Sequence, residues 1–524
     1  MNSISTADYI RILPELVLTV FGILVMVLDP LMKRGSRKGL GILSLIGTFL
    51  AMAAGFYQIN WHGAAWFNMV QVDSFSIFFH VLIPCISGIC ILASLEYLDQ
   101  QSIHSGEYYG LILFGTVGMV LMSSAVELVL IFIALEISSI STYILAGYRR
   151  RTAIGAESSI KYFLLGSFAT AFFLYGVAMI FGATGSTSIP AIHAALQGPT
   201  FGILVYVAVA LMLIGLGFKV AFAPFHIWTP DVYEGAPAPV VALMSTGPKA
   251  AAFAVLLRVL FATNVPTGWF WLIWIAAALS MTLGNFGALI QNNVKRMLAY
   301  SSIAHAGYIL VAFAAGTAAG KEVGLTAAIF YTASYAAMNV GAFAVVSHFA
   351  STGERYVSID DYAGLGKRSP LLAFTLTIFM LSLIGIPLTG GFFAKYYVFN
   401  AALQSNLVWL TIIGVVNSAV AAYYYLRLIV VMYMREQTTD EPLERVSPAM
   451  GLALILAAIG TIYLGVLPGY VLDSATHGAQ ALEPGPLTGV LKIEVKSYGK
   501  VTALQSWKDA EGKIHLTPYQ ATQK

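Results

Sequence analysis

Charged residues are scarce in this chain of 524 residues: Asp, Glu, Lys and Arg together supply 10% of it, whereas 58% is hydrophobic. So few polar side chains cannot cover the surface of a soluble globule of this length, and most of that surface must therefore face lipid. The formal net charge is only +3, which indicates neither a nucleic-acid-binding surface nor an acidic substrate. The composition predicts an integral membrane protein.

Cysteine and the sequence motifs of cofactor binding are also lacking. The only two cysteines, Cys85 and Cys90, lie in one apolar run without a Cys/His cluster, and we expect both in the core. The chain has no P-loop, no glycine-rich dinucleotide motif, no CxxC pair and no iron–sulfur spacing. We therefore expect it to hold no redox cofactor and no metal ion.

Long hydrophobic runs, by contrast, recur from residue 11 to residue 467. A helix needs about 20 residues to cross the bilayer core of about 30 Å, and fourteen runs meet this length. They lie at about 11–30, 38–57, 75–96, 109–126, 127–146, 158–183, 201–228, 237–261, 269–290, 297–315, 324–350, 371–403, 407–434 and 449–467. The first lacks the basic segment and cleavage site of a signal peptide, so we interpret it as a retained span. The sequence predicts an all-α integral membrane fold with about 14 transmembrane helices.

The distribution of Lys and Arg predicts the orientation of these spans, because cytoplasmic loops retain basic residues and exported loops lose them. The loops after odd-numbered spans contain Lys33, Arg34, Arg37, Lys38, Arg149 to Arg151, Lys295, Arg296, Arg355, Lys367, Arg368, Arg435 and Arg445. The loops after even-numbered spans contain only Lys321. We therefore expect both termini on the outer, periplasmic face.

Titratable residues inside the spans are the main functional signal. Each costs roughly 2.5 to 3.5 kcal/mol at the centre of a membrane helix, and four lysines and a glutamate would together cost more than about 10 kcal/mol if unpaired. They are Glu136 in the fifth span, Lys161 at the start of the sixth, Lys219 in the seventh, Lys249 in the eighth, His305 in the tenth and Lys395 in the twelfth. Their joint occurrence favours a functional role.

A proton relay fits these residue types. Desolvation disfavours the charged form of lysine whereas a neighbouring carboxylate favours it, so a Glu–Lys pair that opens and closes loads and unloads a proton. We expect Glu136 to be the electrostatic partner that modulates Lys219. Lys249 and His305 are then the relay sites, and Lys395 donates the proton on the exit side. Three other interpretations stay open: Lys161 snorkels to the inner interface, the deep charges only form structural ion pairs, and His305 is a satisfied core histidine.

Two spans contain helix-breaking residues beside their lysines. The seventh has Pro224, and the twelfth has Gly385, Pro387, Gly390 and Gly391. Both are predicted to be discontinuous, and features that recur five spans apart indicate inverted repeats. The expected domains are residues 1–108 (three N-terminal helices), 109–261 and 269–434 (two inverted five-helix repeats), 449–467 (a last helix) and 485–524 (a polar outer-face tail). Alternation in the tail and its DAEGK turn predict a small β-hairpin.

The chain resembles the antiporter-like membrane subunits of bacterial respiratory complex I, the proton-pumping NADH:quinone oxidoreductase, and among them the subunit N family. The resemblance runs from about residue 10 to residue 470 and is carried by ELVLIFIALEISSISTYIL, GLGFKVAFAPFHIWTPDVYEGAPAPVVALMSTGPKAA, NVKRMLAYSSIAHAGY and GIPLTGGFFAKYYVF. The key glutamate of the family matches Glu136, and its lysines match Lys161, Lys219, Lys249 and Lys395. Subunits L and M usually differ at Lys249, and subunit M also differs at Lys395.

This resemblance implies a non-redox, proton-translocating subunit in the bacterial plasma (inner) membrane. FMN, iron–sulfur clusters and quinone are then expected in partner subunits of the membrane and peripheral arms. Three alternatives remain: a sodium/proton antiporter subunit of the multi-subunit type, a structural scaffold, and a plastid or cyanobacterial relative that takes electrons from ferredoxin.

Overall fold

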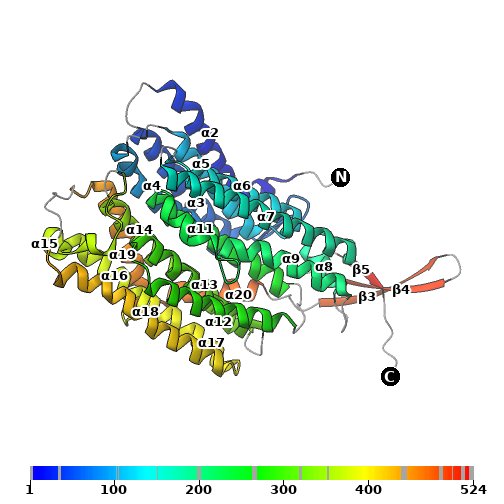
Figure 1. Ribbon diagram of the computed structural model, residues 1–524. Helices are drawn as coiled ribbons and strands as arrows, with labels where there is room; N and C mark the ends of the chain where they lie inside the picture. Colours follow the sequence, from blue (N-terminus) through cyan, green and yellow to red (C-terminus); the bar gives the residue numbers. More distant parts are fainter. Residues whose placement is uncertain are drawn as a thin grey trace. The chain divides into compact units, whose positions relative to one another are not determined.

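The computed structural model describes residues 4–32, 37–101, 103, 105–149, 152–196, 202–262, 268–317, 321–350, 353–437, 445–482, 488–497, 500–508 and 514–518. Two compact units emerge, residues 1–482 and residues 483–524. The first unit is almost entirely helical, and the second contains strands (Figure 1). Lys33, Arg34, Arg150 and Arg151, which entered the orientation argument, lie outside the described residues, as does the side chain of Lys321.

The first unit contains helices and one short β-ribbon. The helices are α1 Thr6–Arg11, α2 Leu13–Leu28, η1 Asp29–Leu31, α3 Lys38–Tyr57, η2 Gln58–Asn60, α4 Ser74–Gln100, α5 Glu107–Ser124, α6 Leu128–Ala146, α7 Ala153–Thr184, α8 Ile189–Ala195, α9 Ile203–Val220, α10 Trp228–Gly235, α11 Ala238–Ala262, α12 Gly268–Leu289, α13 Val294–Thr317, α14 Lys321–Phe349, η3 Ile359–Tyr362, α15 Leu365–Arg368, α16 Pro370–Ile384, α17 Gly390–Gln404, α18 Val408–Met434, α19 Pro448–Val466 and α20 Gly469–Ala481. Strands β1 Gly63–Ala65 and β2 Val70–Val72 pair antiparallel between η2 and α4.

Twelve of the described helices are long and apolar enough to cross a membrane. They coincide with the predicted spans except the fourth, which corresponds to α5, and the twelfth, which corresponds to α16 and α17. The predicted all-α membrane fold is therefore confirmed. The count of fourteen crossings, the orientation and the domain boundaries stay predictions.

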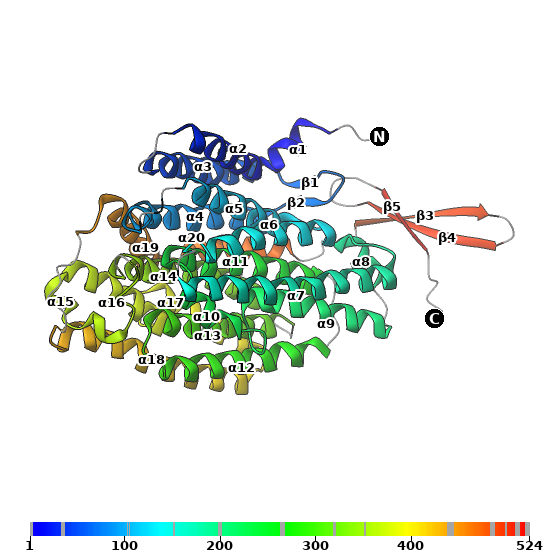
Figure 2. The ribbon, with the colours of Figure 1, turned by 45° about the horizontal axis from the view of Figure 1, so that its top comes forward.

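The centre of the first unit is formed by α11, α13 and α14, whose apolar windows are almost completely buried within the protein. In Figure 2, α2 and α3 lie at one edge, α12 and α18 lie at the opposite edge, and α11 runs between them. The edge helices expose Val, Ile, Leu and Phe side chains, as expected where lipid rather than water is the solvent. Lys219, Lys249 and Lys395 are all buried within this unit.

The seventh predicted span is broken, as expected. Helix α9 ends at Val220, Ala221 takes a left-handed backbone conformation with φ of 63°, and α10 begins only at Trp228. Backbone groups freed by the break find side-chain partners: the indole of Trp228 donates to the Phe218 carbonyl (3.0 Å), and the Ala223 amide donates to Ser280 Oγ (2.8 Å). Irregular backbone at membrane depth requires such internal partners.

The twelfth predicted span is broken at the residues that the sequence indicated. Helix α16 ends at Ile384 and is capped by Gly385, whose φ of 94° is readily reached only by glycine, and Pro387 follows within the break. Helix α17 then restarts so close to α16 that a Cβ on Gly391 would lie 1.8 Å from the Ser382 carbonyl oxygen. Glycine at this position is therefore a steric requirement.

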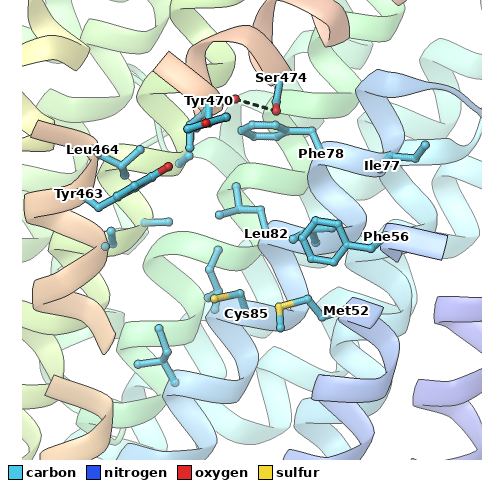
Figure 3. Close-up of a pocket in the computed structure, with 18 of the residues that line it drawn as sticks. Met52, Phe56, Ile77, Phe78, Leu82, Cys85, Tyr463, Leu464, Tyr470 and Ser474 are labelled. Atoms are coloured by element: carbon cyan, nitrogen blue, oxygen red, sulfur yellow. Dashed lines mark hydrogen bonds between the residues drawn. The ribbon is translucent and has the colours of Figure 1, made fainter. Parts of the chain in front are cut away.

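Two details of the sequence interpretation are wrong. Lys295 and Arg296 belong to the first turn of α13 rather than to a loop, and Lys295 is completely buried. Cys85 is exposed whereas Cys90 is buried, so only one cysteine is a core residue. Cys85 is exposed because it lines a cavity of about 800 Å³ between the helices, together with Met52, Phe56, Leu82 and Tyr470 (Figure 3).

The second unit is a small antiparallel sheet in the order β3-β4-β5. Its strands are β3 Thr488–Ser497, β4 Lys500–Lys508 and β5 Ile514–Pro518. The predicted hairpin is confirmed, since β4 and β5 pair on the two sides of the predicted turn, whose residues 509–513 lie outside the described residues. Strand β3 adds a third strand that the sequence did not indicate.

The break between α16 and α17 leads to a test of packing. We expect Gly391→Ala to lower the melting temperature of the purified protein or to impair its folding, because overpacking of this kind costs about 1 to 3 kcal/mol or more. The matched control is Gly469→Ala at the start of α20, where a Cβ meets no atom within 4 Å. Equal melting temperatures for the two variants would contradict the steric argument.

Candidate functional site

Lys219 is the last lysine before the break in α9, and its side chain is buried against α6 and α7. Its ammonium group donates to Ser139 Oγ (3.0 Å) and lies 5.8 Å and 5.7 Å from the ring centroids of Tyr143 and Tyr162. Glu136 belongs to the same helix as Ser139, one turn earlier, and its Oε1 is buried and has no hydrogen-bond partner among the residues that the structure describes. The structure thus brings the predicted Glu–Lys pair near each other without a direct ion pair.

Lys249 lies in the fully buried middle of α11. Its ammonium group donates to Ser302 Oγ (2.5 Å) and to the Ser302 carbonyl (3.2 Å), and Tyr335 donates to the same hydroxyl (2.7 Å). A void of about 10 Å³ borders Lys249, Ser302 and Tyr335. That is about the space of one water molecule beside polar groups that can bind it.

His305 occupies the buried face of α13 at the next position along the bundle. Its Nδ1 is 2.8 Å from the Tyr331 hydroxyl, and its Nε2 is 3.4 Å from the Tyr425 hydroxyl. Tyr425 in turn shares a short hydrogen bond with Ser301. The ring is hydrogen-bonded on both sides, as a satisfied core histidine or a relay histidine would be.

Lys395 reaches back from α17 to the open end of α16. Its ammonium group donates to the carbonyls of Leu383 (3.0 Å) and Ile384 (2.7 Å) and to Ser418 Oγ (2.8 Å). The last carbonyls of a helix lack partners in the helix and carry partial negative charge, so they favour a cation. All three N–H groups of the ammonium are satisfied.

These side chains form a file through the middle of the bundle. From Lys249, the Ser302 hydroxyl leads to Tyr335, whose ring centroid is 5.1 Å from that of His305. The ring of Tyr308 lies 5.7 Å from that of His305 on one side and 5.0 Å from the Lys395 ammonium on the other. Polar or aromatic groups therefore lie between each member of this half and the next.

Between Lys219 and Lys249 the contacts are aromatic. Tyr162, beside Lys219, stacks on Trp228 at 4.5 Å, and Trp228 contacts Tyr233 at 6.0 Å between ring centroids. The Tyr233 hydroxyl is buried and has no hydrogen-bond partner in the described part of the chain. An unsatisfied buried hydroxyl at this point is a place where a water molecule would be stabilised.

Lys161 lies apart from the file and is 39% exposed. It pairs with Asp231 (2.7 Å) and with Glu157 one turn earlier (2.6 Å), and Asp231 also binds Arg296 (2.7 Å), which binds Glu234 (2.7 Å). The partial exposure is what snorkelling predicts, while the ion pairs give the lysine titratable neighbours. The structure places Lys161 in a charged cluster at the bundle surface.

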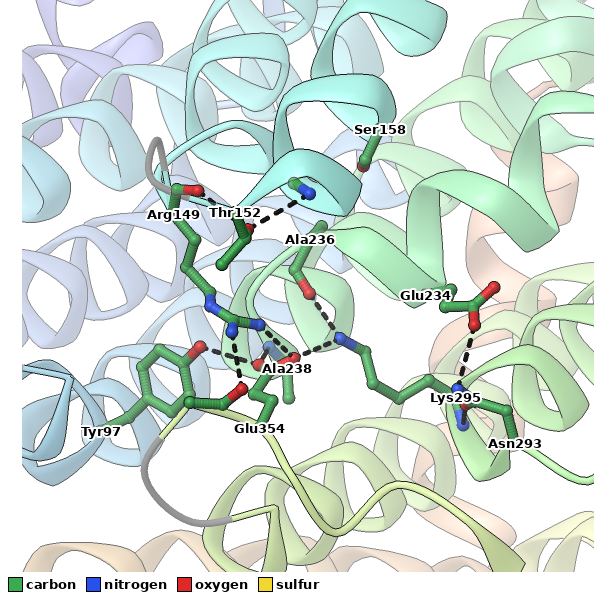
Figure 4. A network of polar contacts seen from close by, with 12 residues as sticks. Tyr97, Arg149, Thr152, Ser158, Glu234, Ala236, Ala238, Asn293, Lys295 and Glu354 are labelled. Carbon is green, nitrogen blue, oxygen red and sulfur yellow. Dashed lines mark hydrogen bonds and ion pairs between the residues drawn. The ribbon is translucent and has the colours of Figure 1, made fainter.

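The sequence analysis missed a buried cluster around Glu354. This carboxylate accepts hydrogen bonds from Tyr97 (2.7 Å) and the Ala238 amide (2.8 Å), and it pairs with Lys295 (2.7 Å) and Arg149 (2.9 Å). Figure 4 shows these groups converging from separate segments of the chain. Although burial raises the pKa of Glu354, the charges of Lys295 and Arg149 outweigh it and hold that pKa below its ordinary value.

Further buried charges near the start of α4 were also missed. Arg258 of α11 forms two hydrogen bonds with the Asp73 carboxylate (2.8 and 3.0 Å), and Glu15 and His80 are both buried in the neighbouring helices. The intramembrane-charge rule that found the lysines also applies to Arg258, Glu15 and His80, so a complete scan of the spans would have detected them. In the described part of the chain, no group of three or more His, Cys, Asp or Glu residues could hold a metal ion.

A family match and a full-length relative both liken this chain to NADH:quinone oxidoreductase proteins. The family described as NADH:quinone oxidoreductase/Mrp antiporter, a transmembrane family, matches residues 125–421. The chain is 66% identical over 490 residues to NADH-quinone oxidoreductase subunit N 2 of Koribacter versatilis, covering 92% of this chain and 98% of that protein.

Solved structures show the same fold. A chain of respiratory complex I from Thermus thermophilus with bound aureothin has a TM-score of 0.76 at 36% identity, covering 89% of this chain and all of that one. A chain of the Mrp complex from Dietzia sp. DQ12-45-1b has a TM-score of 0.81 at 22% identity, covering 92% and 98%. The second likeness, at this low identity, concerns the fold alone.

The Glu354 cluster predicts a pH-dependent stability. Since its pKa is lowered from the ordinary value of 4.5, ionised Glu354 stabilises the fold above that value, and the stabilisation is lost as the pH falls through the lowered pKa. We expect Glu354→Gln to remove this acid dependence and to destabilise the protein by about 3 to 5 kcal/mol at neutral pH, because Lys295 stays buried without its carboxylate.

Melting temperatures of the purified complex between pH 3 and pH 7, about the range in which carboxylates titrate, provide the measurement. The control is Asp360→Asn, which breaks an exposed pair with Arg435 and should change stability little. A Glu354→Gln variant as stable as this control would contradict the proposed role of the cluster.

Proposed function

Since the chain belongs to the subunit N family of the NADH-quinone oxidoreductases, we propose that it translocates protons through a relay of six buried or clustered residues. These are Glu136, Lys161, Lys219, Lys249, His305 and Lys395. Glu136 modulates the proton affinity of Lys219. The proton then passes along the file through Lys249 and His305, and Lys395 donates it on the exit side. Lys161, with its carboxylate neighbours Glu157 and Asp231, is the relay residue at the bundle surface.

One observation carries this proposal: the three deep lysines are hydrogen-bonded to neutral groups. Lys219 contacts Ser139, Lys249 contacts Ser302, and Lys395 contacts two carbonyls and Ser418. Among the residues that the structure describes, none of the three has a carboxylate within ion-pair distance. A structural role would favour paired charges, because an unpaired buried ammonium is costly. Lysines without such partners can instead gain and lose a proton.

The number of hydrogen bonds to each lysine supports the order of the relay. The Lys395 ammonium has three acceptors and lies at the negative end of α16, an arrangement that holds a proton well. Among the described residues, Lys219 donates one hydrogen bond, to Ser139, so its proton depends more on the charge of Glu136. A proton that moves from Lys219 towards Lys395 therefore moves to a more favourable site.

The groups between the lysines suit proton transfer. Serine and tyrosine hydroxyls both donate and accept hydrogen bonds, so they can pass a proton without a net change in their own charge. Ser302 and Tyr335 occupy this position beside Lys249, and Tyr331 and Tyr425 occupy it beside His305. The void next to Lys249 gives room for a water molecule in the same chain.

We further propose that the energy for this transport comes from electron transfer in partner subunits. The relatives and one structural neighbour are named as parts of NADH-quinone oxidoreductase and respiratory complex I. By analogy, this chain would be a non-redox subunit of the translocase, in contact with other membrane-arm and peripheral-arm subunits that hold FMN, iron–sulfur clusters and quinone. Its place would be the bacterial plasma membrane, with both termini on the periplasmic face.

The alternatives are less well supported. A sodium/proton antiporter subunit would share the fold. The sequence of this chain, however, is 22% identical to the Mrp complex chain and 66% identical to a subunit N relative. A pure scaffold is disfavoured by the neutral partners of the three lysines. A plastid or cyanobacterial relative that takes electrons from ferredoxin differs least from the proposal, since it would use the same relay with another electron donor.

Replacing Lys395 or Glu136 by alanine tests the relay. We expect both variants to assemble but to pump protons at least tenfold more slowly, measured as NADH-driven acidification of proteoliposomes that contain the purified complex. Lys38→Ala is the control, because Lys38 is 57% exposed and far from the file in sequence and contact. Normal pumping by both assembled variants would refute the relay, and loss of assembly in both would favour the scaffold.

A further inference from the structure

Glu15 and His80 form a buried pair outside the file of lysines. Glu15 lies in the first turn of α2 and is 6% exposed, and His80 lies in α4 and is completely buried. The His80 Nε2 is 3.8 Å from Glu15 Oε1, which is too long for a hydrogen bond but within ion-pair distance. Within the described residues, neither carboxyl oxygen of Glu15 nor this nitrogen makes another hydrogen bond of ordinary geometry, although the Ser124 hydroxyl lies near Glu15 and the Val120 carbonyl lies near His80.

Gln58 determines which nitrogen of His80 carries a hydrogen. The Gln58 amide group donates to the carbonyls of Ile10 (3.2 Å) and Arg11 (2.9 Å), so its nitrogen side is fixed. The opposite side, Oε1, therefore faces His80 Nδ1 at 2.7 Å. An amide oxygen only accepts hydrogen bonds, so Nδ1 must be the donor.

This assignment leaves Nε2 as the atom that faces Glu15. In a neutral imidazole with a hydrogen on Nδ1, Nε2 is an acceptor, and an ionised carboxylate is also an acceptor only. Two acceptors facing each other in a buried place would leave both unsatisfied, which is unfavourable, and more so when one of them is charged. One proton between them removes the conflict, either on the carboxyl or on Nε2.

We propose that Glu15 and His80 bind one proton between them, as a proton site that is separate from the relay. The neighbouring charges do not replace this proton. Asp73 of the α4 cap and Arg258 of α11 both act on His80 with opposite signs, and they neutralise each other through two hydrogen bonds. From α5, the Ser124 hydroxyl and the Val120 carbonyl are the groups that act on Glu15 and His80, and neither is charged.

The position of the pair sets it apart from the relay. Glu15 and His80 lie near the start of α2 and α4, where α3 ends and where Arg11 holds the carbonyls of Trp61, His62 and Ala64. Arg258 is nine residues from Lys249 on α11, about 13 Å at 1.5 Å per residue. The pair therefore lies towards the end of the bundle at which α2 and α4 begin, and it is separated from Lys249 along α11.

Infrared spectra of the purified, fully assembled complex test the proposal. We expect the difference between wild type and Glu15→Gln at neutral pH to contain either the band of a protonated carboxyl group or the bands of a carboxylate with an imidazolium. His80→Phe should shift or abolish the same signal, because it removes the second partner of the proton. Asp360→Asn, at an exposed carboxylate, should show only an ionised carboxylate.

An ionised Glu15 carboxylate together with a neutral His80 ring would overturn the proposal. If Glu15→Gln fails to assemble, Glu15→Asp keeps the carboxyl group, and its difference spectrum should show the same protonated species at a shifted frequency. Pumping is not the readout, so the result does not depend on whether the proposed relay is correct.

Discussion

A membrane interior offers no water to a polar group, and the three deep lysines of this protein are arranged to satisfy that constraint. The contact between Lys395 and the open end of α16 shows how it is met. Breaking the helix exposes carbonyls that need a donor, and burying lysine creates an ammonium that needs acceptors. Either feature alone is unfavourable, whereas together they satisfy each other. The other deep lysines depend on the same exchange with serine side chains on facing helices.

The two broken helices solve this problem differently. After α9, the chain runs through Ala221 in a left-handed conformation, and the freed groups bind Trp228 and Ser280 rather than Lys219. After α16, the freed carbonyls bind Lys395 directly. The lysine thus precedes the break in one case and folds back onto it in the other. The two broken helices therefore need not hold their cations with equal strength.

Much of this architecture could be predicted from the sequence, because helices that face lipid require long runs of apolar residues. Apolar runs of sufficient length located the spans, and the glycines and prolines around Gly385 located a break. Depth in a span also selected Lys219, Lys249 and Lys395. The Glu354 cluster could not be found in this way, since its members Tyr97, Arg149 and Lys295 come from segments far apart in the chain. Lys295 was predicted to lie in a loop, because hydropathy does not reveal that a carboxylate elsewhere in the chain will pair with it.

The Glu354 cluster also has a consequence for biogenesis. Its four partners are contributed by α4, by the segment after α6, by the start of α11 and by α13, so Glu354 can engage them only after all of these have been inserted. Until residue 354 leaves the ribosome, Lys295 and Arg149 lack their shared counterion. Closure of this cluster must therefore follow the synthesis of α4, α6, α11 and α13, and it becomes possible while α16 to α20 are still to be made.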